Sequence, residues 1–179
     1  RILVLTKYDL CDKKETNKWI QYYKSQKKYV ISVDLIKHGN FTKELLNAVQ
    51  EVMKEENDKR KQKGLTERRT RMLIVGIPNV GKSTIINRLV GKKVSIIEDT
   101  PGITRDRIYG NVHYKDYNFH LIDTGGIDTS EADFNDVIKM QAELAIDEAD
   151  VVLFVVDGKE GITSGDRIVR DMLIKSSKK

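Results

Sequence analysis

The chain has 179 residues, a formal net charge of +5 and a single cysteine. This length suits one domain with its own apolar core, while one thiol excludes an internal disulfide framework and fits the reducing cytoplasm. The longest apolar run, Val151–Val156, is too short for a membrane span, so we expect neither a membrane anchor nor a membrane partner.

Short apolar runs alternate along the chain with longer amphipathic stretches. This alternation is typical of an α/β fold in which helices flank a mostly parallel sheet. A short polar connection separates the fourth and fifth runs. It predicts an antiparallel hairpin, because a parallel crossover needs a longer connection. The six predicted strands are Ile2–Leu5, Tyr29–Val33, Met72–Val75, Ile108–Tyr114, Asn118–Ile122 and Val151–Val156.

Between these runs, apolar residues recur at helical spacing, which we interpret as core packing. The predicted helical stripes are Phe41–Met53, Ile138–Ile146 and Ile168–Leu173. Residues 147–150 spell the helicase box Asp-Glu-Ala-Asp, but they precede an apolar run instead of ending one. We therefore interpret them as the end of a helix.

The excess of positive charge is concentrated in residues 54–71, where Lys and Arg cluster. Such a run is more often a solvated helix end and linker than an arm that contacts RNA. We favour the linker.

The clearest motif is Gly-Ile-Pro-Asn-Val-Gly-Lys-Ser-Thr at residues 76–84, which matches GxxxxGK[ST]. It follows an apolar run and precedes a helix-like stretch, which is the context in which this motif binds phosphates. Glycines let backbone amides approach the phosphates, and the helix N-terminus adds partial positive charge. We expect Lys82 to reach the β- and γ-phosphates and Ser83 to ligate Mg²⁺. The nucleotide-binding residues predicted here are Asn79, Val80, Gly81, Lys82, Ser83 and Thr84.

Two further segments suit the γ-phosphate side of such a site. Asp123 ends an apolar run before Thr-Gly-Gly, so we expect it to act on Mg²⁺ through a bound water and the Gly126 amide to donate to the γ-phosphate. In the polar loop 99–106, Thr104 is the predicted Mg²⁺ ligand and Thr100 the second choice, since a loop that closes on the metal needs a hydroxyl. An ordinary surface loop is the alternative. The predicted catalytic residues are thus Lys82, Thr104 and Gly126.

The first run ends in Thr-Lys-Tyr-Asp at residues 6–9, where a GTPase would carry Asn-Lys-x-Asp to read guanine. The Asp9 carboxylate can accept hydrogen bonds from guanine N1–H and the 2-amino group, a donor pair that adenine lacks. The Lys7 stem would pack over the base, and the Thr6 hydroxyl would replace the Asn side chain as a loop tether. A backbone amide around Asp34–Leu35 would receive the guanine carbonyl.

These motifs place guanine recognition ahead of phosphate binding, which predicts a single circularly permuted domain over residues 1–179. We divide it into a guanine-specificity half (1–53), a basic connector (54–71) and a P-loop and switch half (72–179). In such a fold, Arg1 and Lys179 should lie near each other.

The two parts of the chain resemble different families. Residues 1–91, with Thr-Lys-Tyr-Asp and the loop Val75–Thr84, resemble the circularly permuted ribosome-assembly GTPases of the RbgA/YlqF type. Residues 92–179 resemble the first G domain of the EngA/Der tandem GTPases, through the strings at 94–109, 121–128 and 147–151. A division near Gly91 indicates a chimera, natural or engineered.

Both resemblances imply a GTPase that binds GTP and GDP with Mg²⁺, and whose parent proteins act on the ribosome or rRNA. Both families have a hydrophobic residue in place of the catalytic Gln, here Ile127, which implies slow hydrolysis. Both also carry the loop Asn, here Asn79, which implies a K⁺ ion that stimulates turnover. The accessory domains of both families are missing from the sequence, which weakens the expectation of ribosome binding.

We therefore expect a slow, Mg²⁺-dependent GTP hydrolase that acts as a switch. One alternative is a nucleotide-binding module with negligible turnover, which Ile127 favours. A second is an ATPase of the same fold, which Thr6 leaves open and Asp9 opposes.

Overall fold

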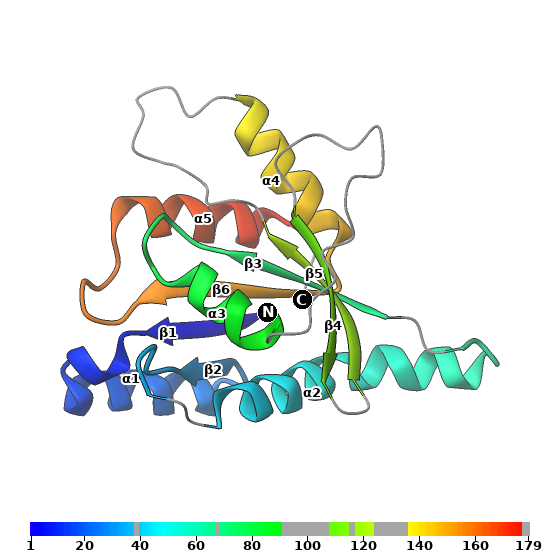
Figure 1. Cartoon of the computed structure of the whole chain (residues 1–179), viewed down its shortest axis with the longest axis horizontal. Helices are drawn as coiled ribbons and strands as arrows, with labels where there is room; N and C mark the ends of the chain where they lie inside the picture. The colour runs from blue at the N-terminus through cyan, green and yellow to red at the C-terminus, as the bar shows by residue number, and fades with distance from the viewer. Residues whose placement is uncertain (38–39, 67–68, 91–107, 115–116, 124–135, 177–179) are drawn as a thin grey trace.

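Six strands form one sheet in the order β2-β1-β6-β3-β5-β4 (Figure 1). The computed structural model describes residues 1–37, 40–66, 69–90, 108–114, 117–123 and 136–176. Neighbouring strands are parallel except for β4 and β5, which pair antiparallel from Ile108↔Asp123 to Tyr114↔Tyr117 and so confirm the predicted hairpin. The strands are β1 (Ile2–Thr6), β2 (Tyr29–Ser32), β3 (Thr70–Val75), β4 (Ile108–Tyr114), β5 (Tyr117–Asp123) and β6 (Val151–Asp157).

Helices cover both faces of the sheet. Along β3, Met72 and Ile74 point into one apolar core and Leu73 and Val75 into the other, because successive strand residues face opposite sides. The first core also holds the buried side chains of α2 and α3, and the second those of α4 and α5. The helices are α1 (Lys13–Ser25), α2 (Phe41–Gln62), α3 (Lys82–Val90), α4 (Asp136–Glu148) and α5 (Ser164–Lys175), with a short 3-10 helix η1 (Tyr8–Leu10).

The central strand β6 is buried along almost its whole length, with the pattern Val-Val-Leu-Phe-Val-Val-Asp. A continuous apolar run is what a parallel strand covered on both faces requires. β6 pairs with β1 on one side and with β3 on the other. A strand from near the end of the sequence therefore lies between one from its start and one from its middle.

The helix α2 is longer than its apolar stripe and continues through the basic stretch to Gln62. Lys and Glu have good helix propensity, and Lys59 Nζ lies 2.6 Å from Glu55 Oε1 one turn earlier. The predicted connector 54–71 is therefore helical over its first half, and this end of α2 extends beyond the sheet (Figure 1).

The two ends of the described chain meet. The Arg1 guanidinium Nη2 donates to the Ser176 carbonyl oxygen at 3.0 Å and lies 3.3 Å from the Ser176 hydroxyl. Lys179, which we expected near Arg1, lies outside the described residues. None of the helices that the structure describes is long and apolar enough to span a membrane.

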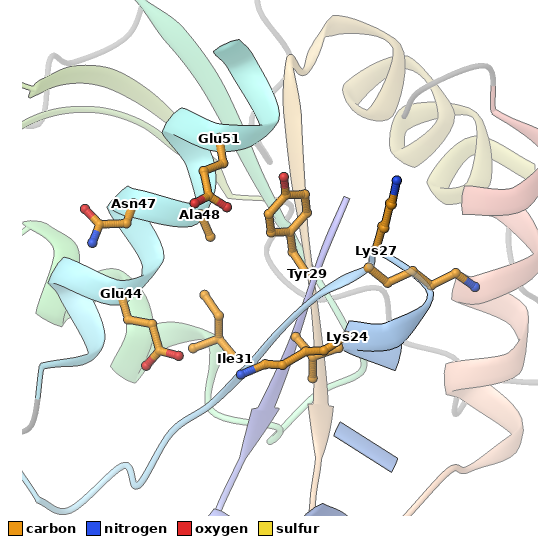
Figure 2. A pocket seen from close by; sticks show the side chains of 10 residues that line it. Lys24, Lys27, Tyr29, Ile31, Glu44, Asn47, Ala48 and Glu51 are labelled. Atoms are coloured by element: carbon orange, nitrogen blue, oxygen red, sulfur yellow. The ribbon is translucent and has the colours of Figure 1, made fainter. Parts of the chain in front are cut away.

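Two hollows lie away from the loop at 76–81. One, of about 500 Å³, lies at the sheet edge beside β2, with Lys24 and Lys27 on one wall and Glu44 and Glu51 of α2 on the other (Figure 2). The second, of about 590 Å³, is a mostly apolar groove between α1 and α5, and it reaches Asp157 at the end of β6.

Candidate nucleotide-binding site

Two loops that carry predicted motifs follow the carboxyl ends of β1 and β3, the parallel strands on either side of β6. Thr6 ends β1, Val75 ends β3 and Asp157 ends β6. In open α/β sheets, ligands bind in the crevice outside these strand ends. The order β1-β6-β3 therefore brings the segment at residues 6–9 beside the loop at 76–81.

The loop between β3 and α3 has the backbone of an anion-binding turn. Asn79 is left-handed with φ 63°, and Gly81 has φ 94°, a region that glycine enters without steric cost. Gly76 packs so closely on β6 that a Cβ there would lie 2.5 Å from the Val155 carbonyl oxygen. Changes of handedness between successive residues point amides into one concavity, and α3 begins directly after it at Lys82.

The ammonium group of Lys82 lies inside this loop. Its Nζ donates to the carbonyl oxygens of Gly76 at 2.8 Å and Ile77 at 2.7 Å, and the residue is only 8% exposed. The positive charge is thereby held beneath the backbone that would cradle a phosphate. Ser83 and Thr84 lie in the first turn of α3, exposed and half-buried respectively.

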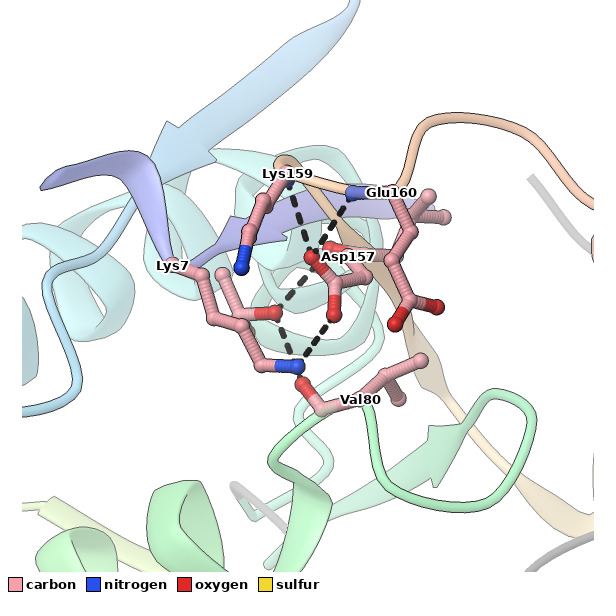
Figure 3. A network of polar contacts seen from close by, with 7 residues as sticks. Lys7, Val80, Asp157, Lys159 and Glu160 are labelled. Atoms are coloured by element: carbon pink, nitrogen blue, oxygen red, sulfur yellow. Dashed lines mark hydrogen bonds and ion pairs between the residues drawn. The ribbon is translucent and has the colours of Figure 1, made fainter. Parts of the chain in front are cut away.

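Thr6, which we predicted as a loop tether, contacts the loop before α3. Its buried hydroxyl donates to the Val80 carbonyl oxygen at 2.7 Å and also lies 3.2 Å from the Val156 carbonyl oxygen (Figure 3). One side chain at the end of β1 thus holds both the phosphate-binding loop and the end of β6.

Lys7 lies beside this tether in a left-handed conformation, with φ 50°. Its Nζ forms an ion pair with Asp157 Oδ2, which raises the pKa of Lys7 (Figure 3). Asp157 is 3% exposed and also accepts hydrogen bonds from the amides of Lys159 at 2.9 Å and Glu160 at 3.2 Å. Burial by itself would raise the pKa of Asp157, but the bonds from Lys7 and the two amides outweigh it, so the pKa lies below its ordinary value.

The backbone of the two strand ends is equally close. The Gly158 amide donates to the Thr6 carbonyl oxygen at 2.9 Å, and a Cβ on Gly158 would lie 2.8 Å from that oxygen. Only glycine allows this approach. Asp157 and Gly158 were not among the predicted site residues, although an Asp-Gly pair that ends an apolar strand is a signal that could have indicated them.

The segment Asp34–Lys37, after β2, also reaches the site. The Asp34 carboxylate accepts from the amides of Ile36 at 2.8 Å and Lys37 at 3.0 Å, and the bonds from Lys37 and Ile36 lower the pKa of Asp34. The Leu35 side chain lies against the phosphate-binding loop, since a Cβ on Gly81 would meet Leu35 Cδ1 at 2.5 Å.

Arg88 of α3 is a further residue that sequence reasoning missed. Its guanidinium donates to the carbonyl oxygen of Asp34 at 2.9 Å and to that of Leu35. No local pattern indicates this contact, because it joins residues more than fifty positions apart.

The remaining predicted residues are placed less completely. Asp9 lies in η1, half-buried, directly after Lys7 and Tyr8. Asp123 is the last residue of β5 and pairs in register with Ile74 of β3. Thr104 and Gly126, with Thr100 and Ile127, lie outside the described residues.

A glycine-rich loop at the carboxyl edge of a parallel sheet, with a buried lysine at the start of the next helix, defines a P-loop nucleotide-binding fold. Residues 71–179 match the protein family described as 50S ribosome-binding GTPase, and the chain belongs to this family.

Curated relatives agree with this assignment. The chain is 58% identical over 105 residues to GTPase Der of Staphylococcus saprophyticus, and 57% identical over the same length to GTPase Der of Staphylococcus aureus. These matches cover 59% of this chain and 24% of each relative, so the chain spans about a quarter of their length. The matched stretch is longer than residues 92–179, so the similarity to Der reaches back across the phosphate-binding loop, upstream of the division that we placed near Gly91.

The solved structures to which the chain is similar include two from T. maritima. GNP-bound YlqF from T. maritima is 26% identical, with a TM-score of 0.45, over 97% of this chain and 56% of that one. The G domain of the T. maritima FeoB iron transporter is 28% identical, with a TM-score of 0.44, over 62% of this chain and 69% of that one.

Proposed function

We propose that this chain is a circularly permuted G domain that binds guanine nucleotides and slowly hydrolyses GTP to GDP and phosphate. The observation that carries the proposal is the hydrogen bond from the Thr6 hydroxyl to the Val80 carbonyl. It attaches Thr-Lys-Tyr-Asp, near the start of the chain, to the phosphate-binding loop in its middle. Under this proposal, residues 1–53 read the base, 54–71 connect, and 72–179 bind phosphates.

The phosphates would be bound by the loop amides and the start of α3. Asn79, Val80 and Gly81 supply the turn, and the N-terminus of α3 supplies Ser83 and Thr84. Lys82 Nζ would exchange its two carbonyl acceptors for phosphate oxygens. A rotation of the side chain would be enough for this exchange. Held in place before the reaction, this charge stabilises the negative charge that develops as phosphate leaves.

The base would be read between η1 and the segment after β2. Asp9 would accept from guanine N1–H and the 2-amino group, and an amide at Asp34–Leu35 would donate to the guanine carbonyl. The Lys7 side chain, with its head fixed on Asp157, would lie along the base.

Magnesium fits the residues at the same edge. Ser83 lies in the first turn of α3, and Asp123 ends β5 opposite Ile74, next to the start of the phosphate-binding loop. Hydroxyl and carboxylate oxygens are the hard ligands that Mg²⁺ takes beside phosphate oxygens. We propose Ser83, Asp123 and Thr104 as the residues that hold it, and Gly126 as a γ-phosphate donor. The ion, when bound, neutralises phosphate charge.

Two parts of the proposal rest on the family resemblance. A K⁺ ion at Asn79 would stimulate turnover, and Ile127 in place of a water-orienting Gln would keep the intrinsic rate low. Ribosome association is proposed on the family's description alone, with no residue of this chain assigned to it.

The decisive experiment is a fluorescence titration with labelled GDP, GTP and ATP on the wild type and on Asp9→Ala. Micromolar guanine binding that is lost in the variant supports the permuted site. Binding that ignores the base or Asp9 contradicts it. A single-turnover assay with GTP then separates a slow hydrolase from a module that binds without turnover.

A further inference from the structure

We propose that Arg88 is a positioning residue for guanine recognition, and that it aims the Leu35 amide at the base while coupling that amide to the phosphate-binding helix. The inference rests on the proposed function, because it concerns the same site. Arg88 lies on α3, the helix that begins at Lys82, and its guanidinium holds two successive carbonyl oxygens of the segment after β2.

Three amides on either side of Leu35 are already committed. The Val33 amide donates to the Leu5 carbonyl oxygen at 2.8 Å, as a continuation of the ladder between β1 and β2. The amides of Ile36 and Lys37 donate to the Asp34 carboxylate at 2.8 and 3.0 Å. Leu35 lies between these fixed points.

Peptide planarity then sets the direction of the Leu35 amide. In a trans peptide the carbonyl of one residue and the N–H of the next point to opposite sides. Because Arg88 holds the Asp34 carbonyl at 2.9 Å, the Leu35 N–H is turned to the side away from Arg88. A guanidinium suits this task, since its planar fork can engage two carbonyl oxygens at once.

The Leu35 side chain ties the same residue to the phosphate side. It lies so close to Gly81 that any Cβ there would meet Leu35 Cδ1 at 2.5 Å. The base-reading amide and the phosphate-binding loop are therefore fixed to each other through Leu35, and to α3 through Arg88. Weakening the Arg88 contact should loosen the donor to the base without changing Lys82 or the loop.

The test compares how tightly three nucleoside diphosphates bind to Arg88→Met. This variant keeps a long side chain but removes every hydrogen-bond donor. GDP and IDP both carry the carbonyl at position 6, whereas ADP does not. We expect Arg88→Met to weaken the binding of GDP and of IDP about tenfold each, which is the scale of one lost hydrogen bond to a ligand. The affinity for ADP should stay unchanged. The ratio of GDP to IDP affinity, which Asp9 sets through the 2-amino group, should be preserved.

Two further variants keep the result interpretable. Arg88→Lys retains the charge but not the planar pair of donors, so it should weaken GDP binding less than Arg88→Met does. Arg170→Met removes an exposed arginine that forms an ion pair with its neighbour Asp171, and should leave the affinity for all three nucleotides unchanged. Unchanged GDP affinity in Arg88→Met, or an equal loss for GDP, IDP and ADP, overturns the inference. If the wild type fails to bind GDP, the proposed function itself is wrong.

Discussion

The Thr6 hydroxyl oxygen and the Val80 carbonyl oxygen lie 2.7 Å apart, although 74 positions separate the two residues in the sequence. The contact is fully buried and joins the end of β1 to the loop before α3. The Thr6 side chain therefore attaches the end of β1 to this loop.

Removal of this hydroxyl should destabilise the fold and weaken nucleotide binding together. Thr6→Val keeps the shape but leaves the buried Val80 carbonyl without its donor, which should cost about 1–3 kcal/mol in the free energy of unfolding. Urea denaturation measures the loss, and GDP titration the effect on binding. Thr6→Ser keeps the hydroxyl and should bind GDP like the wild type; equal behaviour of the Ser and Val variants would contradict the tether.

The ion pair between Lys7 and Asp157 should make stability depend on pH at both extremes. The pKa of Asp157 is below the ordinary 3.8, so its contribution is complete above that pH and is lost in stronger acid, as pH falls through the lowered value. The pKa of Lys7 is above the ordinary 10.5, so its contribution is complete below that pH and is lost as pH rises through the raised value.

Asp157→Asn provides the comparison for this pH dependence. We expect the free energy of unfolding of the wild type to fall more steeply than that of Asp157→Asn as the pH is lowered below about 4, where the carboxylate becomes protonated. Parallel curves for the two proteins, measured by denaturant titration across that range, would show that Asp157 adds nothing to acid sensitivity.

Lys82 should be needed for binding triphosphate. Lys82→Met removes two charge-assisted hydrogen bonds to phosphate, so GTP should bind about a hundredfold more weakly. Lys59→Met, on the exposed end of α2, removes a lysine of the same kind and serves as the control. Comparable GTP affinity in the two variants would exclude the assigned role of Lys82.

Gly81 is constrained by its positive φ and by the nearby Leu35 side chain, and substitutions can separate these two effects. Gly81→Ala forces a Cβ onto a residue with φ 94° and into Leu35 Cδ1 at 2.5 Å, so it should cost about 1–3 kcal/mol in the free energy of unfolding. Adding Leu35→Ala to Gly81→Ala should recover only the part of the lost free energy of unfolding that comes from the steric clash. Gly64→Ala, at φ 67° with nothing within 4 Å, reports the backbone cost alone. A double variant no more stable than Gly81→Ala would show that Leu35 does not press on the loop.

Potassium should act through Asn79. We expect single-turnover GTP hydrolysis to be faster in KCl than in NaCl, and the difference to vanish in Asn79→Gly. Glycine is the suitable replacement because Asn79 has φ 63°, which glycine adopts without strain. A salt difference that survives in the variant would place the ion elsewhere.

The sequence predicted those parts of the fold that depend on local patterns. The apolar runs of β3 and β6 and the hairpin of β4 and β5 follow from strand burial and from a connection too short for a crossover. The interpretation of Asp147–Asp150 as a helix end is confirmed, since α4 ends at Glu148 and Asp150 instead binds Arg71. The interpretation of the basic stretch as beginning with a helix end also agrees with the structure, since α2 continues to Gln62.

The parts of the site that the sequence indicated are those with local sequence signals. The turn at 76–84 and the tether at Thr6 come from motif residues at fixed spacings. Asp157 and Arg88 act on residues 150 and 54 positions away, and such contacts exist only once the strand order is known.

The place of β1 between β2 and β6 also governs how the protein can be made. During synthesis β1 and β2 appear first, but β6, which pairs with β1 from Ile2↔Leu153 to Thr6↔Asp157, is the last strand to be translated. A pair of strands alone is marginal in water, and distant pairings form slowly. The segment at residues 6–9 is thus translated before the loop at 76–81, but the strand that holds it in the sheet, β6, is complete only when Asp157 has been added.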